Sequence, residues 1–275
     1  MKFADNDIEF LRGCLGHVAE HEIMPRFRNA VASKVAEKTS SVDLVTQADL
    51  LSEAYITAKL QERFPGALVV GEEAYDADPS VVPALAEAEL GFVIDPVDGT
   101  FNFAAGLPVF ATMLAVTVRG ETVASIIHEP VFGDTLIAMK GAGSFLHRAN
   151  AEPQRLQVAP ALPLGEMVGS MAFSHMPEPM RSRVAANMAR TKMSFNYNCS
   201  AYEYWMASSG KFHFIGHLKL MPWDHLAGVL LHQEAGGYTA KFNGTLYRPG
   251  ETTGGIISAP DRENWQMIRA EIVGD

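Results

Sequence analysis

The sequence predicts a mixed fold of helices and sheets, α+β in its N-terminal half and α/β in its C-terminal half. Three observations lead to this prediction. Apolar residues recur at helical spacing in two early stretches, 8–33 and 46–64. Apolar runs separated by short turns follow between positions 110 and 147, which is typical of antiparallel strands. After position 167, predicted strands and helices alternate along the chain.

Length and composition limit the domain organisation. The chain has 275 residues, of which 48% are hydrophobic, enough to bury a large core. We expect an N-terminal half over residues 1–158 that carries most of the functional residues discussed below. We expect a C-terminal half over residues 159–275 that closes the functional site, and the two halves should form one compact unit. The boundary falls in the Pro- and Ala-rich segment 159–165.

Charge and cysteine content exclude several partners. A net charge of −10 argues against nucleic acid, because the phosphate backbone attracts a basic surface. Cys14 and Cys199 are the only cysteines, so we expect no disulfide framework and a cytoplasmic location. The acidic N-terminus does not resemble a signal peptide. No apolar stretch is long enough to span a bilayer, so we expect no membrane partner.

The first half opens with two predicted helices. The first covers residues 8–33 and contains His17 and His21 in a short H-x-x-E-H zinc pattern, but no third ligand pattern follows it. We therefore expect a solvated helix face there. The polar stretch 38–45 predicts a loop, and Thr46 is a suitable N-cap for the second helix. Asp43 and Asp49 could favour that helix start through its dipole, the explanation we hold for Asp43.

Two short buried strands then end in acidic residues. The strands are residues 67–70 and 92–94, and the acids that follow them are Glu72, Glu73, Asp95 and Asp98. We expect the second strand to stop at Asp95, because Pro96 cannot continue a strand ladder. Acids in such turns can simply cap them, but the repeat of the arrangement favours a shared site.

The chemistry of these segments suggests a ligand. Carboxylates near a strand end suit a hard divalent cation. Gly99 and Thr100 have the composition of a turn into a helix start, whose free N–H groups suit a phosphate. An acidic chain that binds phosphate needs added positive charge, and metal ions are the usual source. The first functional hypothesis is therefore a site that binds both a metal ion and a phosphate group.

The remaining elements follow the same periodicity rules. We expect strands at 110–118, 122–128, 134–139, 144–147, 167–171, 194–197, 211–215 and 256–258. We expect one helix that follows the strand at 167–171 and ends at about position 190. We expect further helices at 201–209, 226–235 and 260–272. Pro222 and Asp224 fit the start of a helix, so capping alone could explain Asp224.

Five motifs together resemble one family. They are D-x-x-T-x-x-D at 43–49, G-E-E at 71–73, D-P-V-D-G-T at 95–100, W-D with A-G at 223–228, and E-A-G-G at 234–237. Their order and spacing resemble the inositol monophosphatase family, within the wider group of magnesium-dependent, lithium-sensitive phosphatases. The resemblance implies an αβαβα layered sandwich of the fructose-bisphosphatase-like kind, usually a homodimer. It also implies hydrolysis of a small sugar, inositol or nucleotide-type phosphate.

The resemblance also implies roles for individual residues. The implied metal ligands, for two or three Mg²⁺ ions, are Glu72, Asp95, Asp98, Asp224 and the Val97 carbonyl. Asp49 and Thr100, with Glu72 beside them, resemble the group that orients the attacking water. The residues implied to bind substrate are Gly99, Thr100, Ser200, His217 and Asp224.

Two departures from the family pattern concern the leaving-group side. His217 stands where inositol-hydrolysing members have a glutamate that contacts sugar hydroxyls, and Lys219 follows closely. Cys199 and Ser200 stand where the family has a Gly-Thr pair. We therefore expect a leaving group other than plain inositol, one with a carboxylate, a second phosphate or a base edge. The alternative is that His217 points away and only packs the loop.

Two other functions remain open. A haloacid-dehalogenase-type phosphatase also uses an Asp-Gly-Thr signature, but it needs D-x-D, and here Pro96 and Val97 separate Asp95 from Asp98. The other is a non-catalytic protein on the same fold that binds a metal or a sugar phosphate. A phosphate-release assay distinguishes this alternative from an enzyme.

Overall fold

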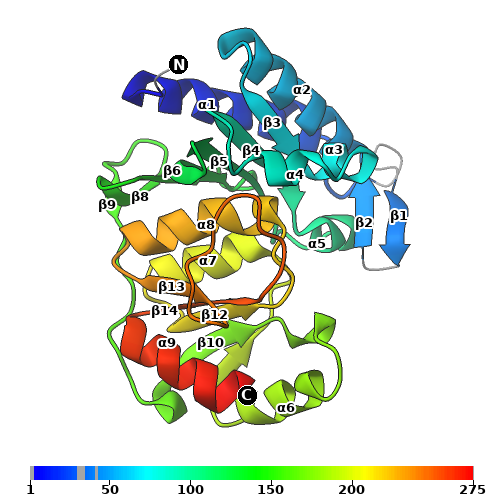
Figure 1. The fold of residues 1–275 in the computed structure, drawn as a ribbon. Helices are drawn as coiled ribbons and strands as arrows, with labels where there is room; N and C mark the ends of the chain where they lie inside the picture. Colours follow the sequence, from blue (N-terminus) through cyan, green and yellow to red (C-terminus); the bar gives the residue numbers. More distant parts are fainter. Residues whose placement is uncertain (1–2, 30–34, 41–42, 275) are drawn as a thin grey trace.

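Helices and sheets alternate in layers through the molecule (Figure 1). The computed structural model describes residues 3–29, 35–40 and 43–274. From one side to the other, the layers are α1 with α2, a seven-stranded sheet, α7 with α8, a five-stranded sheet, and α6 with α9. This confirms the predicted αβαβα sandwich.

The outer layer at the N-terminus holds α1 (Asp5–Val18), which continues as a π-helical turn (Ala19–Ile23), and α2 (Gln47–Arg63). The first helix is shorter than expected over its described part, because Pro25 lacks the N–H that would extend it. Residues 30–34 lie outside the described part of the chain. Thr46 is the N-cap of α2, as predicted.

The prediction of a loop at 38–45 is wrong for residues 38–40 and 43–45, which are the part of this segment that the structure describes. Strand β1 (Val35–Ser40) pairs antiparallel with β2 (Asp43–Thr46), which leads directly into α2. Polar composition does not prevent two strands from pairing, because backbone groups alone make the ladder. Asp43 therefore begins a strand and does not lie in the first turn of the helix.

The seven-stranded sheet runs in the order β3-β4-β5-β6-β7-β8-β9. Its strands are β3 (Leu68–Gly71), β4 (Gly91–Asp98), β5 (Ala111–Val118), β6 (Glu121–His128), β7 (Thr135–Met139), β8 (Gly143–His147) and β9 (Gln154–Arg155). Strands β4 to β9 are antiparallel to their neighbours, as the short turns predicted. Only β3 and β4 are parallel among these pairs. Two short helices, α3 (Glu72–Ala77) and α4 (Val81–Ala84), fill the connection between them.

The five-stranded sheet runs in the order β11-β10-β12-β14-β13. Its strands are β10 (Val168–Met171), β11 (Met193–Phe195), β12 (Phe214–His217), β13 (Tyr238–Lys241) and β14 (Ile256–Ala259). Strand β12 begins and ends later than expected, so His217 is its last residue. The helix expected directly after β10 is replaced by a 3₁₀ turn (Phe173–His175), and α6 (Met180–Met188) begins only beyond Pro177 and Pro179.

Three apolar cores fill the spaces between the layers. Phe92 and Ile94 of β4 pack beneath α1 and α2, while Val93 faces the helices of the middle layer. That layer holds α7 (Ser200–Ser208) and α8 (Pro222–Glu234), and α8 is buried on nearly all sides because both sheets cover it. The third core lies between the five-stranded sheet and α6 with α9 (Arg262–Ile268). In the described chain, no helix has the length and apolar character to cross a membrane.

Candidate active site

A β-bulge in β4 brings two aspartates to one face of the seven-stranded sheet. The strand runs on through Pro96, so the expectation that it stops at Asp95 is wrong. Three steps along β4, from Asp95 to Asp98, match only two steps along β5, and the missing N–H of Pro96 falls in this interruption. Alternation alone would put Asp95 and Asp98 on opposite faces. The bulge corrects this, and Val97 turns into the core beneath α1 and α2.

Glu72 reaches the same edge from the neighbouring strand. Strands β3 and β4 are parallel, with Gly71 opposite Ile94. Their carboxyl ends therefore meet, and Glu72 begins α3 next to the end of β4 that holds Asp95. The shared site predicted from two acid-ended strands thus has its geometric basis in a parallel pair.

Glu53 of α2 fixes the start of α3. Its carboxylate accepts hydrogen bonds from the backbone N–H groups of Glu73 at 2.9 Å and Ala74 at 2.8 Å. A Cβ atom at position 71 would lie 2.2 Å from Glu53 Cδ, so Gly71 provides the space for this carboxylate. Glu53 therefore sets the direction in which Glu72 leaves the strand.

Asp49 is fully buried in the first turn of α2. Its Oδ2 accepts hydrogen bonds from the Thr46 backbone N–H at 2.9 Å and the Thr46 hydroxyl at 2.5 Å. Its Oδ1 lies 3.4 Å from Thr100 Oγ1, which donates to the Val97 carbonyl at 2.9 Å. Burial raises the pKa of Asp49 to about 7, with the charge of Glu72 adding to the effect and Thr46 opposing it. Asp49 and Thr100, paired in the sequence analysis, are thus neighbours.

Gly99 joins β4 to the short helix α5 (Thr100–Ala105). It has a φ of +89°, in the left-handed region, and a Cβ there would lie 2.7 Å from the Val109 carbonyl oxygen. Only glycine fits this turn without strain. No side chain of the described chain caps α5, which begins directly after Asp98 and Gly99.

Asp98 ties the end of β4 to the start of α7. Its Oδ2 accepts a hydrogen bond from the Ala201 backbone N–H at 2.5 Å and lies 3.1 Å from Cys199 Sγ. Burial raises the pKa of Asp98, and hydrogen bonds from Ala201, Cys199 and Ser200 oppose the rise. Burial and the charge of Asp98 raise the pKa of Cys199 well above its usual value, so it remains a thiol that can donate to Asp98.

The acidic side chains act on one another through their charges. We call the group Asp49, Glu72, Asp95, Asp98 and Asp224 the acidic cluster. Burial raises the pKa of Asp95 well above its usual value, and the other four members raise it further. Asp224, in the first turn of α8, has its pKa raised by burial, Glu72 and Asp98, while the charge of Lys219 opposes the rise. The predicted acids are therefore brought together from three layers of the fold.

The acidic cluster fits divalent cations in charge and donor type. Asp95 Oδ1 is buried and has no hydrogen-bond partner among the described residues. Burying an ionised carboxylate without compensation costs on the order of several kcal/mol. Within the described chain, no three His, Cys, Asp or Glu side chains already form a group that could hold a metal ion. Binding an ion would therefore require the carboxylates to draw closer together.

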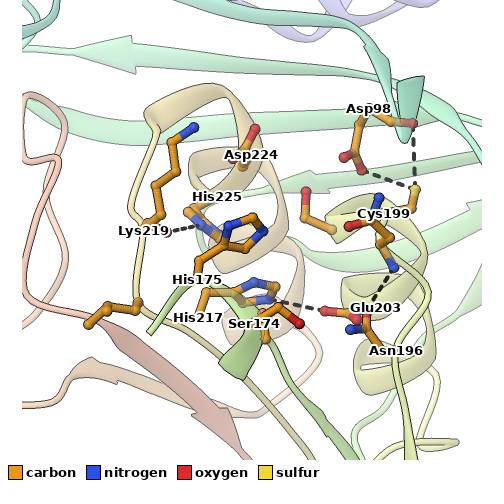
Figure 2. Close-up of a pocket in the computed structure, with 14 residues that line it drawn as sticks. Asp98, Ser174, His175, Asn196, Cys199, Glu203, His217, Lys219, Asp224 and His225 are labelled. Carbon is orange, nitrogen blue, oxygen red and sulfur yellow. Dashed lines mark hydrogen bonds and ion pairs between the residues drawn. The ribbon is translucent and has the colours of Figure 1, made fainter. Parts of the chain in front are cut away.

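A pocket of about 330 Å³ opens beside the acidic cluster (Figure 2). Asp98, Asp224 and Lys219 lie toward one end in this view, and His217, Ser174 and Asn196 lie toward the other. Ser200, which the sequence analysis proposed as a substrate-binding residue, also lines the pocket.

His217 forms part of the pocket wall and is held there by a buried carboxylate. Its Nε2 lies 3.1 Å from Oε2 of Glu203 in α7. The other oxygen of Glu203 accepts a hydrogen bond from the Ser170 hydroxyl at 2.7 Å. His225 supports the adjacent loop, because its Nε2 lies 2.9 Å from the Lys219 carbonyl oxygen. Burial lowers the pKa of His225 well below its usual value, so this ring is neutral.

Several residues of the site were missed from the sequence. They are Glu53, Ser174, His175, Asn196, Asn198 and Glu203. Glu203 had a usable signal, since an acid within the apolar and aromatic helix A-Y-E-Y-W must be buried with a partner. The loop residues had none, because polar loop composition is common.

The H-x-x-E-H pattern forms no metal site within the described residues. The rings of His17 and His21 stack on each other with centroids 4.2 Å apart, and Tyr55 stacks on His17. His21 Nδ1 lies 3.0 Å from the His17 carbonyl oxygen. These contacts stabilise the helix surface.

Known proteins resemble this chain along nearly its whole length. The inositol monophosphatase family model matches residues 8–273. A Thermotoga maritima protein named fructose-1,6-bisphosphatase/inositol-1-monophosphatase is 28% identical over 211 residues, which cover 76% of each protein. A Vibrio cholerae protein named Nus factor SuhB is 28% identical over 251 residues, covering 89% of this chain and 88% of its own.

Solved structures show the same layers. The extragenic suppressor protein SuhB of Bartonella henselae matches with a TM-score of 0.82 at 22% identity, over 98% of both chains. An IMPase of Thermotoga maritima matches with a TM-score of 0.78 at 26% identity, over 98% of this chain and 95% of its own.

Proposed function

Because the chain belongs to the inositol monophosphatase family, we propose that it is a Mg²⁺-dependent hydrolase of small phosphate monoesters. The observation that carries this proposal is the acidic cluster, which lies beside both the start of α5, where no described side chain forms a cap, and a pocket. The net charge of −10 supports a small phosphorylated metabolite over nucleic acid as partner. A cytoplasmic homodimer is part of the same proposal.

The acidic cluster supplies the proposed metal ligands. Glu72, Asp95, Asp98, Asp224 and the Val97 carbonyl would hold two or three Mg²⁺ ions. Bound Mg²⁺ would neutralise the carboxylates, lower the pKa of an attacking water and stabilise charge on the transferred phosphoryl group. The Val97 carbonyl accepts a hydrogen bond from Thr100, and a carbonyl oxygen has a second lone pair that can bind a cation.

The other residues of the site position the reactants. Asp49 and Thr100, with Glu72 beside them, would orient the attacking water. A carboxyl group with a pKa of about 7 can accept a proton near neutral pH, as Asp49 would do here. The backbone N–H groups of Gly99 and Thr100 would hold the phosphate, and the pocket beyond would receive the leaving group.

Two alternatives make different predictions. The name Nus factor SuhB, carried by several relatives, is not that of a phosphatase. A non-catalytic protein on this fold would release no phosphate. The presence of every proposed ligand acid in one cluster supports catalysis over this alternative. A haloacid-dehalogenase-type enzyme would form an aspartyl-phosphate, and trapping that species on Asp95 would favour it.

Phosphate release should require Mg²⁺. We expect activity to vanish in excess chelator and to return when Mg²⁺ is restored, because the clustered carboxylates need cations. Ca²⁺ should support activity poorly, since it is larger and looser in its coordination geometry. The measurement is phosphate release from a panel of sugar, inositol and nucleotide phosphates. Full activity in excess chelator would exclude the proposed mechanism.

Lithium should inhibit at millimolar-scale concentrations. The family resemblance motivates this expectation, in which Li⁺ replaces one weakly held Mg²⁺. The assay compares LiCl with NaCl at equal ionic strength, so that screening of charges is the same in both. Equal inhibition by the two salts would contradict the expectation.

A further inference from the structure

A second pocket of about 380 Å³ lies between α9 and the turn that follows β13. Strand β13 is at the edge of the five-stranded sheet, and α9 belongs to the outermost layer, on the opposite side of the molecule from α1 and α2 (Figure 1). The wall of this second pocket shares no residue with the pocket beside the acidic cluster. Its volume suits a small ligand.

One face of the last helix forms much of the wall of the second pocket. Four of the lining residues follow the i, i+3, i+4 and i+7 spacing of a single helix face. They are Arg262, Trp265, Gln266 and Arg269, the last of which begins the π-helical turn after α9. With a rise of about 1.5 Å per residue, the two arginines are separated by roughly 10 Å along the helix, and the indole lies between them.

The two arginines bring positive charge to this wall. Arg262 is exposed, and its guanidinium lies over the Tyr238 ring, 6.0 Å from the ring centroid. Arg269 donates from Nε to the Phe242 carbonyl oxygen at 2.8 Å and from Nη1 to the Gly274 carbonyl oxygen. A ring and two carbonyl groups are neutral partners, and no carboxylate of the described chain forms an ion pair with either arginine.

No acidic side chain lines the second pocket among the described residues. The nearest acids in the sequence are Asp261 and Glu263, on either side of Arg262. Asp261 is the N-cap of α9 and accepts the Asn264 backbone N–H at 2.7 Å, while Glu263 is exposed outside the wall. In a chain with a net charge of −10, a wall with two guanidinium groups and no carboxylate favours an anionic ligand.

The rest of the wall is aromatic and amide. The rings of Tyr238 and Trp265 meet edge to face, with centroids 6.0 Å apart. The Trp265 indole N–H donates to the Ala240 carbonyl oxygen at 3.1 Å, so this ring offers only apolar surface to a ligand. Asn243 Oδ1 accepts the backbone N–H and the hydroxyl of Thr245, which leaves the NH₂ group of Asn243 to donate. A flat ring therefore suits the middle of the pocket.

We propose that the second pocket binds a small ligand that combines a flat aromatic ring with an anionic group. Arg262 would pair with the anion, Arg269 and Asn243 would add hydrogen-bond donors, and the ring would lie against Trp265 and Tyr238. Nucleotides and aromatic carboxylates share this chemistry. The proposal does not depend on the phosphatase function, because the acidic cluster contributes nothing to this wall.

The indole N–H signals in a ¹⁵N NMR spectrum of the whole protein test the proposal. The chain has three tryptophans, and Trp205→Phe and Trp223→Phe each remove one signal, which assigns the third to Trp265. Trp223 is next to Asp224 in the sequence, so its signal reports binding beside the acidic cluster. Mg²⁺ is present throughout, so that the acidic cluster is in the same state in every titration.

Two matched pairs of probes separate the two sources of the ligand. Cyclic AMP and adenosine differ by a charged phosphate, and cyclic AMP is a diester that a monoester hydrolase does not consume. Indole-3-acetate and indole-3-acetamide differ by the charge of a carboxylate. We expect the anionic member of at least one pair to shift the Trp265 signal with a Kd of about 1 mM or below, and its neutral partner to bind about tenfold more weakly. Inorganic phosphate, which has no ring, should also bind more weakly.

Variants assign the binding to the wall. Arg262→Met should raise the Kd of the preferred probe about tenfold, because charge-assisted hydrogen bonds are lost. Arg262→Lys should restore part of the affinity, since it keeps the charge without the planar fork. Arg248→Met is the matched control, because Arg248 is exposed and outside the wall. Thermal unfolding of each variant checks that it is folded.

The inference fails if no probe moves the Trp265 signal at concentrations up to about 10 mM. It also fails if the neutral probes or inorganic phosphate bind as tightly as the anionic ring compounds, or if Arg262→Met leaves the Kd unchanged. A shift of the Trp223 signal alone would place the probe beside the acidic cluster and would overturn the inference too. None of these results depends on phosphate release, so the proposed phosphatase function is tested separately.

Discussion

Asp95→Asn is expected to reduce kcat for phosphate release by roughly two to three orders of magnitude. Asp95 is buried at the centre of the acidic cluster, and all four other members act on its charge. Asparagine has nearly the same shape but cannot supply the negative charge that a cation needs. The fold should remain intact, since the change removes a buried carboxylate whose Oδ1 has no partner in the described chain. Steady-state kinetics and circular dichroism measure the two parts of this expectation.

Asp43→Asn is the control for this experiment. Both residues belong to the acidic motifs, but Asp43 begins β2, ahead of the helix that carries Asp49. We therefore expect its replacement to affect kcat far less. If Asp43→Asn were the more damaging change, the assignment of roles within the motifs would be wrong.

The pairing of Asp95 with Asp98 shows what the sequence could and could not predict. Acids after two apolar strands indicated a shared site, and the parallel pairing of β3 with β4 brings the acid-bearing ends of the two strands together. The sequence could not show that β4 continues through Pro96. A period-two strand would separate the two aspartates, and the register against β5 alone reveals the bulge that reunites them.

The leaving-group side was harder to predict for another reason. His217 was identified by its place in the motif order, but its partner Glu203 lies on a different element, α7. Their contact depends on how α7 packs against β12, and no local pattern encodes that packing. The helices and strands of the core were predictable because their apolar periodicity is local.

The acidic cluster also makes the stability of the protein depend on pH when no metal is bound. Asp49 has a pKa of about 7 in the folded state, raised first by burial, against about 3.9 in an unfolded chain. Burial, and then the charge of Glu72, also raise the pKa values of Asp95 and Asp224 well above that of an ordinary aspartate. The folded protein therefore binds more protons than the unfolded chain between about pH 4 and about pH 7. The free energy of unfolding is highest below about pH 4 from this source, and it falls as pH rises through about 7.

Mg²⁺ should reverse this loss, and the melting temperature measures it. In chelator, the Tm of the unmodified protein should fall between pH 5 and pH 8. It should fall by more than the Tm of the Asp95→Asn variant, which lacks the central acid. Saturating Mg²⁺ should raise Tm by roughly 5 °C or more at pH 8, because cations bind the folded state with its carboxylates ionised. The rise should be smaller at pH 5, where protons compete for the same oxygens, and smaller in Asp95→Asn at both values. A Mg²⁺-induced rise of equal size at both pH values, or one that Asp95→Asn retains in full, would place the cations elsewhere on the protein.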